Sequence, residues 1–224
     1  MTELEVRKNV VSIAEFFLRR YNEVGNHKFI IDLYNQIAPL PRGYKVTYSD
    51  AWCAAFVSAV GYKCGMEHII LPECSCSKMI ALYKAKNLWV EDDGYTPNVA
   101  DIIFYDWEDN GKGDNVGAPN HVGIVTSVSN GIITVIEGNK GNAVAIRNMY
   151  VNGLYIRGYA TPDYASIAAT EKPKLNEWAK DAYKWAVNLG ITDGSFPTEP
   201  ITLERFLTIL YRYDEKRRNS NGTD

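Results

Sequence analysis

The stretch His121-Val-Gly-Ile-Val-Thr-Ser-Val-Ser-Asn-Gly-Ile-Ile-Thr-Val-Ile-Glu137 predicts a β-hairpin, and with it the fold class. Two runs rich in β-branched residues, 121–128 and 132–137, flank the turn signal Ser129-Asn130-Gly131. Further strands are predicted at 102–105 and at 155–159, on either side of the hairpin. We therefore expect an antiparallel sheet in this part of the chain.

The residues before position 90 follow a helical period instead. One apolar face is formed by residues at steps of four, three and four, namely Val6, Val10, Ile13 and Phe17. Further helices are expected over 27–36, over the small apolar stretch 53–63, and from Ser77 to Lys86. Helices followed by an antiparallel sheet indicate an α+β domain in which the N-terminal helices pack on the sheet.

A change in composition divides the chain after residue 162. We expect a main domain at 1–162, a linker at 163–174 and a small helical module at 175–218, because residues 160–174 contain two prolines and no periodic pattern. In the module, helical spacing is kept by Leu175, Trp178, Ala182, Trp185 and Leu189, and Thr202 is a candidate cap of a second helix. Two helices make a small core, so this module is expected to pack on the main domain, another copy or a partner.

Composition and charge exclude several classes of protein. The 224 residues carry a net charge of −3, which argues against a protein that coats nucleic acid. No apolar run approaches the roughly 20 residues of a membrane span. The start Met1-Thr-Glu-Leu-Glu-Val-Arg7 lacks the basic and apolar segments of a signal peptide, so we expect synthesis in the cytoplasm. The four cysteines are expected to be thiols there.

Cys53 is the cysteine best placed to act as a nucleophile. It lies at the expected start of a helix, whose unpaired N–H groups and dipole stabilise a thiolate. Cys64 lies at the other end of that helix, where the dipole has the opposite sign. Cys74 and Cys76 are expected in a loop, and their spacing lacks the second ligand pair of a metal site. The alternative for Cys53 is a small buried packing residue.

His121 begins the first hairpin strand and is the histidine best placed to act as a base, the alternative being a surface or core histidine. A third group should orient its imidazole. If the hairpin loop has three residues, 129–131, then His121 lies opposite Asn139 and Glu137 is the diagonal neighbour on the same face. A loop of two residues would place Glu137 on the other face.

Four segments follow one another in the order Tyr48-Ser-Asp-Ala-Trp-Cys53-Ala-Ala-Phe-Val-Ser58, Ala100-Asp-Ile-Ile-Phe-Tyr105, Asn120-His121-Val-Gly-Ile-Val125 and Val135-Ile-Glu137-Gly-Asn139. Together they resemble the CHAP family, the cysteine, histidine-dependent amidohydrolases/peptidases, over roughly residues 6–160. The resemblance implies a papain-like fold, a nucleophilic Cys53, a basic His121, and Glu137 or Asn139 as the third member.

The same resemblance implies a peptidoglycan hydrolase that cuts an amide bond. Its expected form is an N-acetylmuramoyl-L-alanine amidase acting in host lysis. The long helical lead-in is similar to phage or prophage endolysins of Gram-positive hosts. Such an enzyme acts on the bacterial cell wall after release from the cytoplasm. Two alternatives stay open: an NlpC-type endopeptidase that cuts the stem peptide or cross-bridge, and a non-catalytic cell-wall-binding protein.

Two further groups of residues are candidates for binding. Trp52, Tyr105 and Trp107 lie near the four segments and are candidates for a substrate groove, the alternative being core packing. The loop 106–114 places oxygen ligands at alternate positions, so calcium is considered at Asp106, Glu108, Asn110 and Asp114. Gly117 stands where a calcium loop has its bidentate glutamate, so the alternative is a solvated loop, and the thiol chemistry requires no cofactor.

The C-terminal segments Trp178-Ala-Lys-Asp-Ala-Tyr-Lys-Trp185 and Ile201-Thr-Leu-Glu-Arg-Phe206 resemble a single S-layer-homology repeat. Modules of that type bind cell-wall polymers, usually as three copies. The tail is therefore expected either to bind a secondary cell-wall polymer or to mediate packing or homo-oligomerisation.

Overall fold

The computed structural model describes residues 1–169, 180–189, 191 and 203–220. The chain divides into two compact units, Met1–Ala169 and Thr170–Asp224, and each is described by itself. The first unit combines helices with an antiparallel sheet, which confirms the predicted α+β class. In the described residues, no helix has the length and apolar character needed to cross a membrane.

The helices of the first unit are α1 (Glu3–Arg20), α2 (Lys28–Tyr34), α3 (Cys53–Lys63), α4 (Cys76–Ala85) and α5 (Tyr164–Ala169), with a 3₁₀ turn at Pro41–Gly43. Helix α1 begins with a capping box, in which the side chains of Thr2 and Glu5 bond to each other's backbone N–H. Helix α3 is buried from its first residue to Gly61, so it forms the centre of the core.

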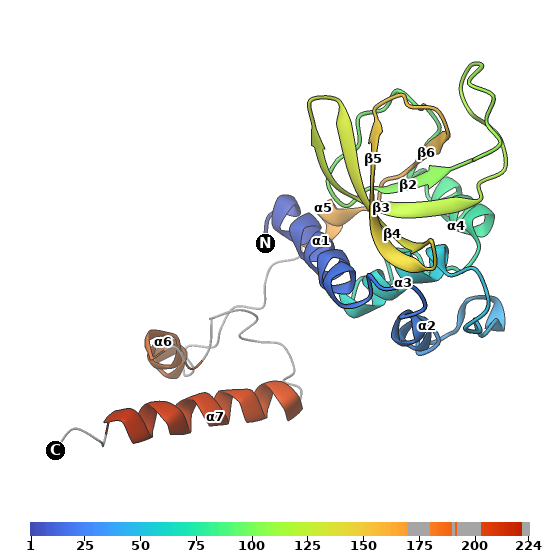
Figure 1. The fold of residues 1–224 in the computed structure, drawn as a ribbon. Coiled ribbons are helices and arrows are strands. Elements are labelled where there is room, and N and C mark those ends of the chain that lie inside the picture. Colours follow the sequence, from blue (N-terminus) through green and yellow to red (C-terminus); the bar gives the residue numbers. More distant parts are fainter. Residues whose placement is uncertain (170–179, 190, 192–202, 221–224) are drawn as a thin grey trace. The chain divides into compact units, whose positions relative to one another are not determined.

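Six strands form one antiparallel sheet in the order β1-β6-β2-β3-β4-β5 (Figure 1). They are β1 (Trp89–Val90), β2 (Ile102–Tyr105), β3 (His121–Ser129), β4 (Ile132–Lys140), β5 (Ala143–Tyr150) and β6 (Ile156–Ala160). Helix α3 packs on β3 and β4. Because successive side chains of a strand face opposite sides, Ile102 and Phe104 join the core under the helices, while Ile103 and Tyr105 join a smaller cluster on the other face.

The hairpin loop between β3 and β4 has two residues, so the predicted three-residue loop is wrong. Ser129 pairs directly with Ile132. Asn130 and Gly131 have φ angles of 52° and 73°, which are the positive values that a tight type I′ turn requires. With this loop alone, Glu137 would face away from His121.

A β-bulge corrects the register. Between Val125 and Ser127 the pairing shifts by one residue, so that Ile124 faces Ile136. This shift restores the alternation at the end of the hairpin that carries His121 and Glu137. The two side chains therefore share a face because of the bulge, not because of the loop length.

The predicted linker at 163–174 differs from the structure in its first part, because residues 164–169 form α5. Tyr164 is fully buried, and its hydroxyl donates to the carbonyl oxygen of Ala100 at 2.8 Å. The guanidinium of Arg7, on α1, lies 4.6 Å from the centre of the same ring. One anchoring aromatic residue makes no periodic pattern, so the sequence gives no sign of this helix. The rest of the predicted linker, 170–174, lies outside the described residues.

In the second unit, the described parts are mainly the helices α6 (Lys180–Asn188) and α7 (Leu203–Ser220). The rings of Trp185 and Tyr213 lie 5.9 Å apart and join these helices. The region predicted as a helical module, 175–218, thus contains two helices, while Leu175, Trp178 and Thr202 lie outside the described residues.

Candidate active site

Cys53 is the first residue of α3, where the backbone N–H groups of the first turn have no side-chain cap. Its side chain is largely buried, with 6% of the residue exposed. A hydrogen bond from Cys76 is the strongest influence on the pKa of Cys53; together with His121 and the N–H of Ala54 it outweighs burial. These groups hold the pKa of Cys53 well below its ordinary value, so this thiol is the ionised one.

A chain of charged contacts orients His121. Its Nε2 lies 3.2 Å from Oε2 of Glu137, and Nε of Arg147 donates to Oε1 of the same carboxylate at 2.5 Å. Glu137 is fully buried. Burial alone would raise the pKa of Glu137, but His121 and Arg147 lower it. The carboxylate therefore stays charged between two cations.

The imidazole of His121 is also shifted toward its charged form. Burial lowers the pKa of His121, but its hydrogen bonds and charge contacts with Cys53 and Glu137 raise it to about 9. Because Glu137 occupies Nε2, Nδ1 is the nitrogen left to face the thiol. The site thus favours a thiolate–imidazolium pair near neutral pH.

Two glycines let the elements of the site approach closely. A Cβ at Gly138, on β4, would lie 2.4 Å from Cβ of Phe56 on α3. A Cβ at Gly123, on β3, would lie 2.8 Å from Cγ of Glu137. Real side-chain atoms do not come so near. Glycine at 138 therefore allows the hairpin to lie against the helix that carries Cys53, and glycine at 123 leaves room for the Glu137 side chain within the hairpin.

The structure brings Cys53, His121 and Glu137 together, although the bulge and not the predicted loop places His121 and Glu137 on one face. Asn139 follows them on β4 with a φ of 59°, beside an irregular step in the β4–β5 pairing. Within the described part of the chain, no hydrogen bond joins its side chain to His121. Glu137 is therefore the partner that the imidazole has in this structure.

The three aromatic candidates differ in exposure. Trp52 is 1% exposed and stacks on His27 with ring centres 5.0 Å apart, so it packs in the core. Tyr105 is fully buried. Trp107 is 37% exposed, and its ring centre lies 4.9 Å from that of Tyr105 and 5.8 Å from that of His121. Trp107 is thus the one of the three that presents a face to solvent beside His121.

Two residues of the site are missed by the sequence analysis. Arg147 lies on β5, a strand that the sequence does not predict, and its guanidinium is 4.6 Å from the ring centre of Trp107. The sequence over 143–150 does not alternate apolar with polar residues, so its only strand signal is the presence of the β-branched Val144 and Ile146. Cys76 is the first residue of α4, one position before the predicted Ser77 cap, and its Sγ lies 3.8 Å from Sγ of Cys53.

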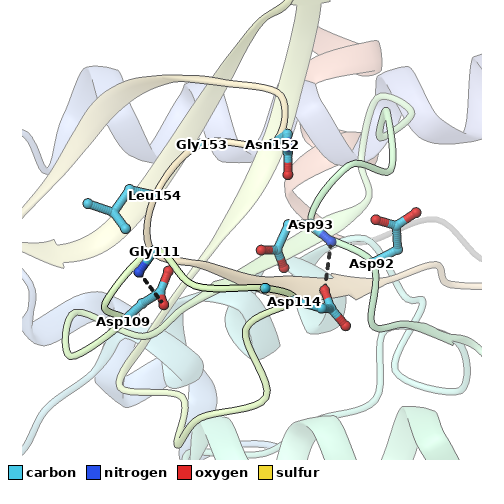
Figure 2. Close-up of a pocket in the computed structure, with 9 residues that line it drawn as sticks. Asp92, Asp93, Asp109, Gly111, Asp114, Asn152, Gly153 and Leu154 are labelled. Carbon is cyan, nitrogen blue, oxygen red and sulfur yellow. Dashed lines mark hydrogen bonds between the residues drawn. The ribbon is translucent and has the colours of Figure 1, made fainter.

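The acidic loop, together with residues 92–93 and 152–154, lines a pocket of about 640 Å³ (Figure 2). Asp92, Asp93, Asp109 and Asp114 line it, and the N–H of Asp93 donates to Asp114 at 3.2 Å. Burial, and then the nearby Asp114 and Asp109, raise the pKa of Asp93 to about 6. The backbone N–H of Asn115 faces the Asp93 carboxylate and partly offsets this effect.

The residues considered for calcium lie in a loop whose side chains make local hydrogen bonds. In the described ranges, no three His, Cys, Asp or Glu side chains are grouped so that they could hold a metal. Asp106 and Asn110 instead accept from the N–H groups of Glu108 and Lys112, each closing its own turn.

Residues 43–139 match the family model of the CHAP domain. This range contains Cys53, His121 and Glu137, whereas Arg147 lies beyond it. The match supports a CHAP-family cysteine amidohydrolase and, in general terms, a hydrolase of peptidoglycan. No curated protein and no solved structure matched the chain.

Proposed function

We propose that the chain is an N-acetylmuramoyl-L-alanine amidase that uses Cys53 as nucleophile, His121 as acid and base, and Glu137 as the group that orients the imidazole. The observation that carries this proposal is the continuous series of contacts from the α3 N-terminus through His121 to Glu137 and Arg147. Such a series combines an activated thiol with an oriented imidazole, the requirement for attack on an unactivated amide.

In the first half of the proposed reaction, the Cys53 thiolate attacks the carbonyl carbon between the lactyl group and L-alanine. The negative charge that develops on the carbonyl oxygen is stabilised by backbone N–H groups at the start of α3. The C–N bond then breaks as the His121 imidazolium gives its proton to the departing amine. The products of this half are a thioester on Cys53 and a free amino terminus on the stem peptide.

In the second half, a water molecule attacks the thioester and His121 takes its proton. The C–S bond breaks, the lactyl carboxylate leaves, and the thiolate–imidazolium pair is regenerated. Throughout both halves, Glu137 stays charged and holds the tautomer and the angle of the ring, since Arg147 fixes its other oxygen. Trp107 supplies an exposed ring beside His121 on which a sugar or peptide segment can pack.

The finer biological role that we propose is that of a phage or prophage endolysin, which reaches the wall after release from the cytoplasm. The resemblance of the helical lead-in supports this role. We also propose that the module formed by α6 and α7 binds a cell-wall polymer, which would keep the enzyme on its substrate. Sedimentation of the full chain and of a chain ending at Ala169 with purified walls tests the second point, since only the full chain should sediment.

The decisive test is digestion of purified peptidoglycan, followed by mass spectrometry of the fragments. The wild-type protein is expected to release stem peptides with a free L-alanine amino group, and Cys53→Ala is expected to release none while keeping its circular dichroism spectrum. Cys64→Ala, which removes a thiol at the other end of the same helix, is the matched control and should digest normally.

The fragments separate the alternatives. If the fragments carry free amino groups at other stem-peptide or cross-bridge positions, the protein is an endopeptidase and not an amidase. Normal digestion by Cys53→Ala would refute the thiol mechanism altogether. Binding to walls without release of fragments by the wild type would identify a non-catalytic binding protein.

A further inference from the structure

Cys76 touches the proposed nucleophile, and the reaction described above gives it no part. Its Sγ lies 3.8 Å from Sγ of Cys53, and both cysteines are free thiols. The two residues begin different helices, α4 and α3, and Cys76 is only 8% exposed. The contact therefore joins two helix N-termini, and both residues are largely buried.

The groups that face the Cys53 sulphur come from three elements. His121 approaches from β3, Cys76 from α4, and the N–H of Ala54 from α3 itself. Glu137 and Arg147, on β4 and β5, act one contact further away through His121. Apart from the imidazole, Cys76 is thus the side-chain donor that this sulphur has among the described residues.

The direction of the hydrogen bond follows from the charges. Two thiolates 3.8 Å apart would repel each other in a buried site, so one of the two sulphurs keeps its proton. Cys53 has the imidazolium beside it. Cys76 has the Cys53 sulphur beside it, and this contact, followed by burial, raises the pKa of Cys76 far above its ordinary value. The S–H of Cys76 is accordingly the donor and Cys53 the acceptor.

We propose that Cys76 is a positioning residue of this site: its S–H donates to Cys53 Sγ, stabilises the thiolate before substrate arrives, and fixes the sulphur at the start of α3. This inference rests on the proposed role of Cys53 as nucleophile. The bond acts on the resting enzyme, because formation of the thioester removes the negative charge that accepts it. A thiolate that loses this donor should be harder to form but more reactive once formed.

The test measures how fast iodoacetamide alkylates Cys53 in the full-length protein between pH 3 and pH 9, read by mass spectrometry of the peptide that contains it. In Cys76→Ala, the acid limb, which is the pH range over which the alkylation rate rises, should lie about one pH unit higher. At pH values below the limb, the rate should therefore be about tenfold lower than in wild type. At pH 8 the same variant should react about threefold faster than wild type, because thiolate nucleophilicity rises with pKa.

Cys76→Ser keeps a donor of similar size and should restore the wild-type limb. Cys64→Ala removes a partly exposed thiol at the C-terminal end of α3 and should leave the profile unchanged. Cys76→Val, which fills the space without a donor, takes the place of the alanine variant if the latter does not give a cooperative thermal transition. A merely structural role would change the melting temperature of these variants without moving the limb.

An unchanged acid limb in Cys76→Ala, or an equal shift in Cys76→Ser, would overturn the inference. The measurement is independent of wall digestion, so the two proposals fail separately. If Cys76→Ala shows the expected shift but the wild-type protein digests no wall, the hydrogen bond is supported and the proposed substrate is refuted. If the wild-type protein digests walls but Cys76→Ala shows no shift of the acid limb, the proposed hydrolase stands and the proposed role of Cys76 is refuted.

Discussion

Glu137 sits at the point where the site is most sensitive to a single change, because it is fully buried between His121 and Arg147. In Glu137→Gln the imidazolium loses its counter-charge, so the pKa of His121 should fall below about 9. We expect kcat/KM for peptidoglycan to fall at least about tenfold at pH 7, since the ring loses both orientation and charge stabilisation.

Digestion rates from pH 5 to pH 10 check this prediction, with Glu108→Gln as a control that removes an exposed carboxylate from the nearby loop. An unchanged alkaline limb in Glu137→Gln would mean that another group holds the imidazole in its charged form.

The ionised pair also predicts the pH dependence of the wild-type enzyme. Activity should rise with ionisation of Cys53 and fall as His121 loses its proton near pH 9, which gives a bell-shaped profile of kcat/KM.

The free energy of unfolding should also depend on the protonation of His121. Because folding raises the pKa of His121, its contribution to the free energy of unfolding is complete below its unfolded pKa and is lost as pH rises through about 9.

Chemical denaturation between pH 6 and pH 10 measures the second effect. His121→Ala should show a smaller decline in the free energy of unfolding over that range than wild type. An equal decline in both proteins would assign the effect to other groups.

At this scale, sequence reasoning finds the residues whose chemistry is local and misses those whose role is tertiary. Cys53 is recognisable because a helix start makes a thiol acidic, and Glu137 because the strand alternation relates it to His121. Cys76 and Arg147 carry no such local signal. Each matters only because folding places it against a residue at least 10 positions away in the chain, at 3.8 Å and 2.5 Å respectively.

Among the elements, the closest contact of the site is that between β4 and α3 at Gly138. A methyl group there would meet Cβ of Phe56 at 2.4 Å and the Trp52 ring at 2.7 Å, and neither can move without shifting the core. Gly138→Ala is therefore expected to lower the free energy of unfolding by about 1–3 kcal/mol, the usual cost of overpacking. Activity should fall further than stability accounts for, since β4 carries Glu137.

Urea denaturation of Gly138→Ala, beside Gly94→Ala, tests this expectation. An added Cβ at Gly94 meets only the flexible Asp92 carboxylate at 3.1 Å, so this control should be nearly neutral. A neutral Gly138→Ala would show that the hairpin and α3 are not as tightly apposed as described.

The elements also show where pattern reasoning stops. Periodicity finds α1 and the hairpin strands, because each has a repeating apolar face, and the continuous apolar composition of 53–63 finds α3. It does not find the bulge at residues 125–127, because a bulge changes the twist of the backbone and leaves no mark on the order of apolar and polar residues. The predicted loop is one residue too long, and the bulge shifts the pairing by one residue. The two differences cancel, so the predicted proximity of His121 and Glu137 is correct although the predicted loop is not.

For the whole molecule, the boundary of the first unit at Ala169 makes a prediction about truncation. A chain ending at Ala169 keeps the core and every residue of the site, so it should retain the melting temperature of the first unit and digest soluble peptidoglycan fragments normally. A chain ending at Pro162 loses Tyr164, which is fully buried, and should be destabilised by about 3 kcal/mol or more.

Thermal melting of the two truncated proteins compares them directly. Equal melting temperatures would mean that α5 contributes nothing to the first unit and that the predicted boundary at 162 is the physical one.

The distribution of the site along the chain has a kinetic consequence. Its members come from α3, α4, β3, β4 and β5, between residues 53 and 147, so no short segment of a growing or refolding chain contains a working pair. Contacts this far apart in sequence form late in folding. Cys53 should therefore react as an ordinary thiol until the hairpin docks on α3, and its pKa should fall when docking occurs. Pulsed alkylation during refolding should then report the time at which the hairpin docks.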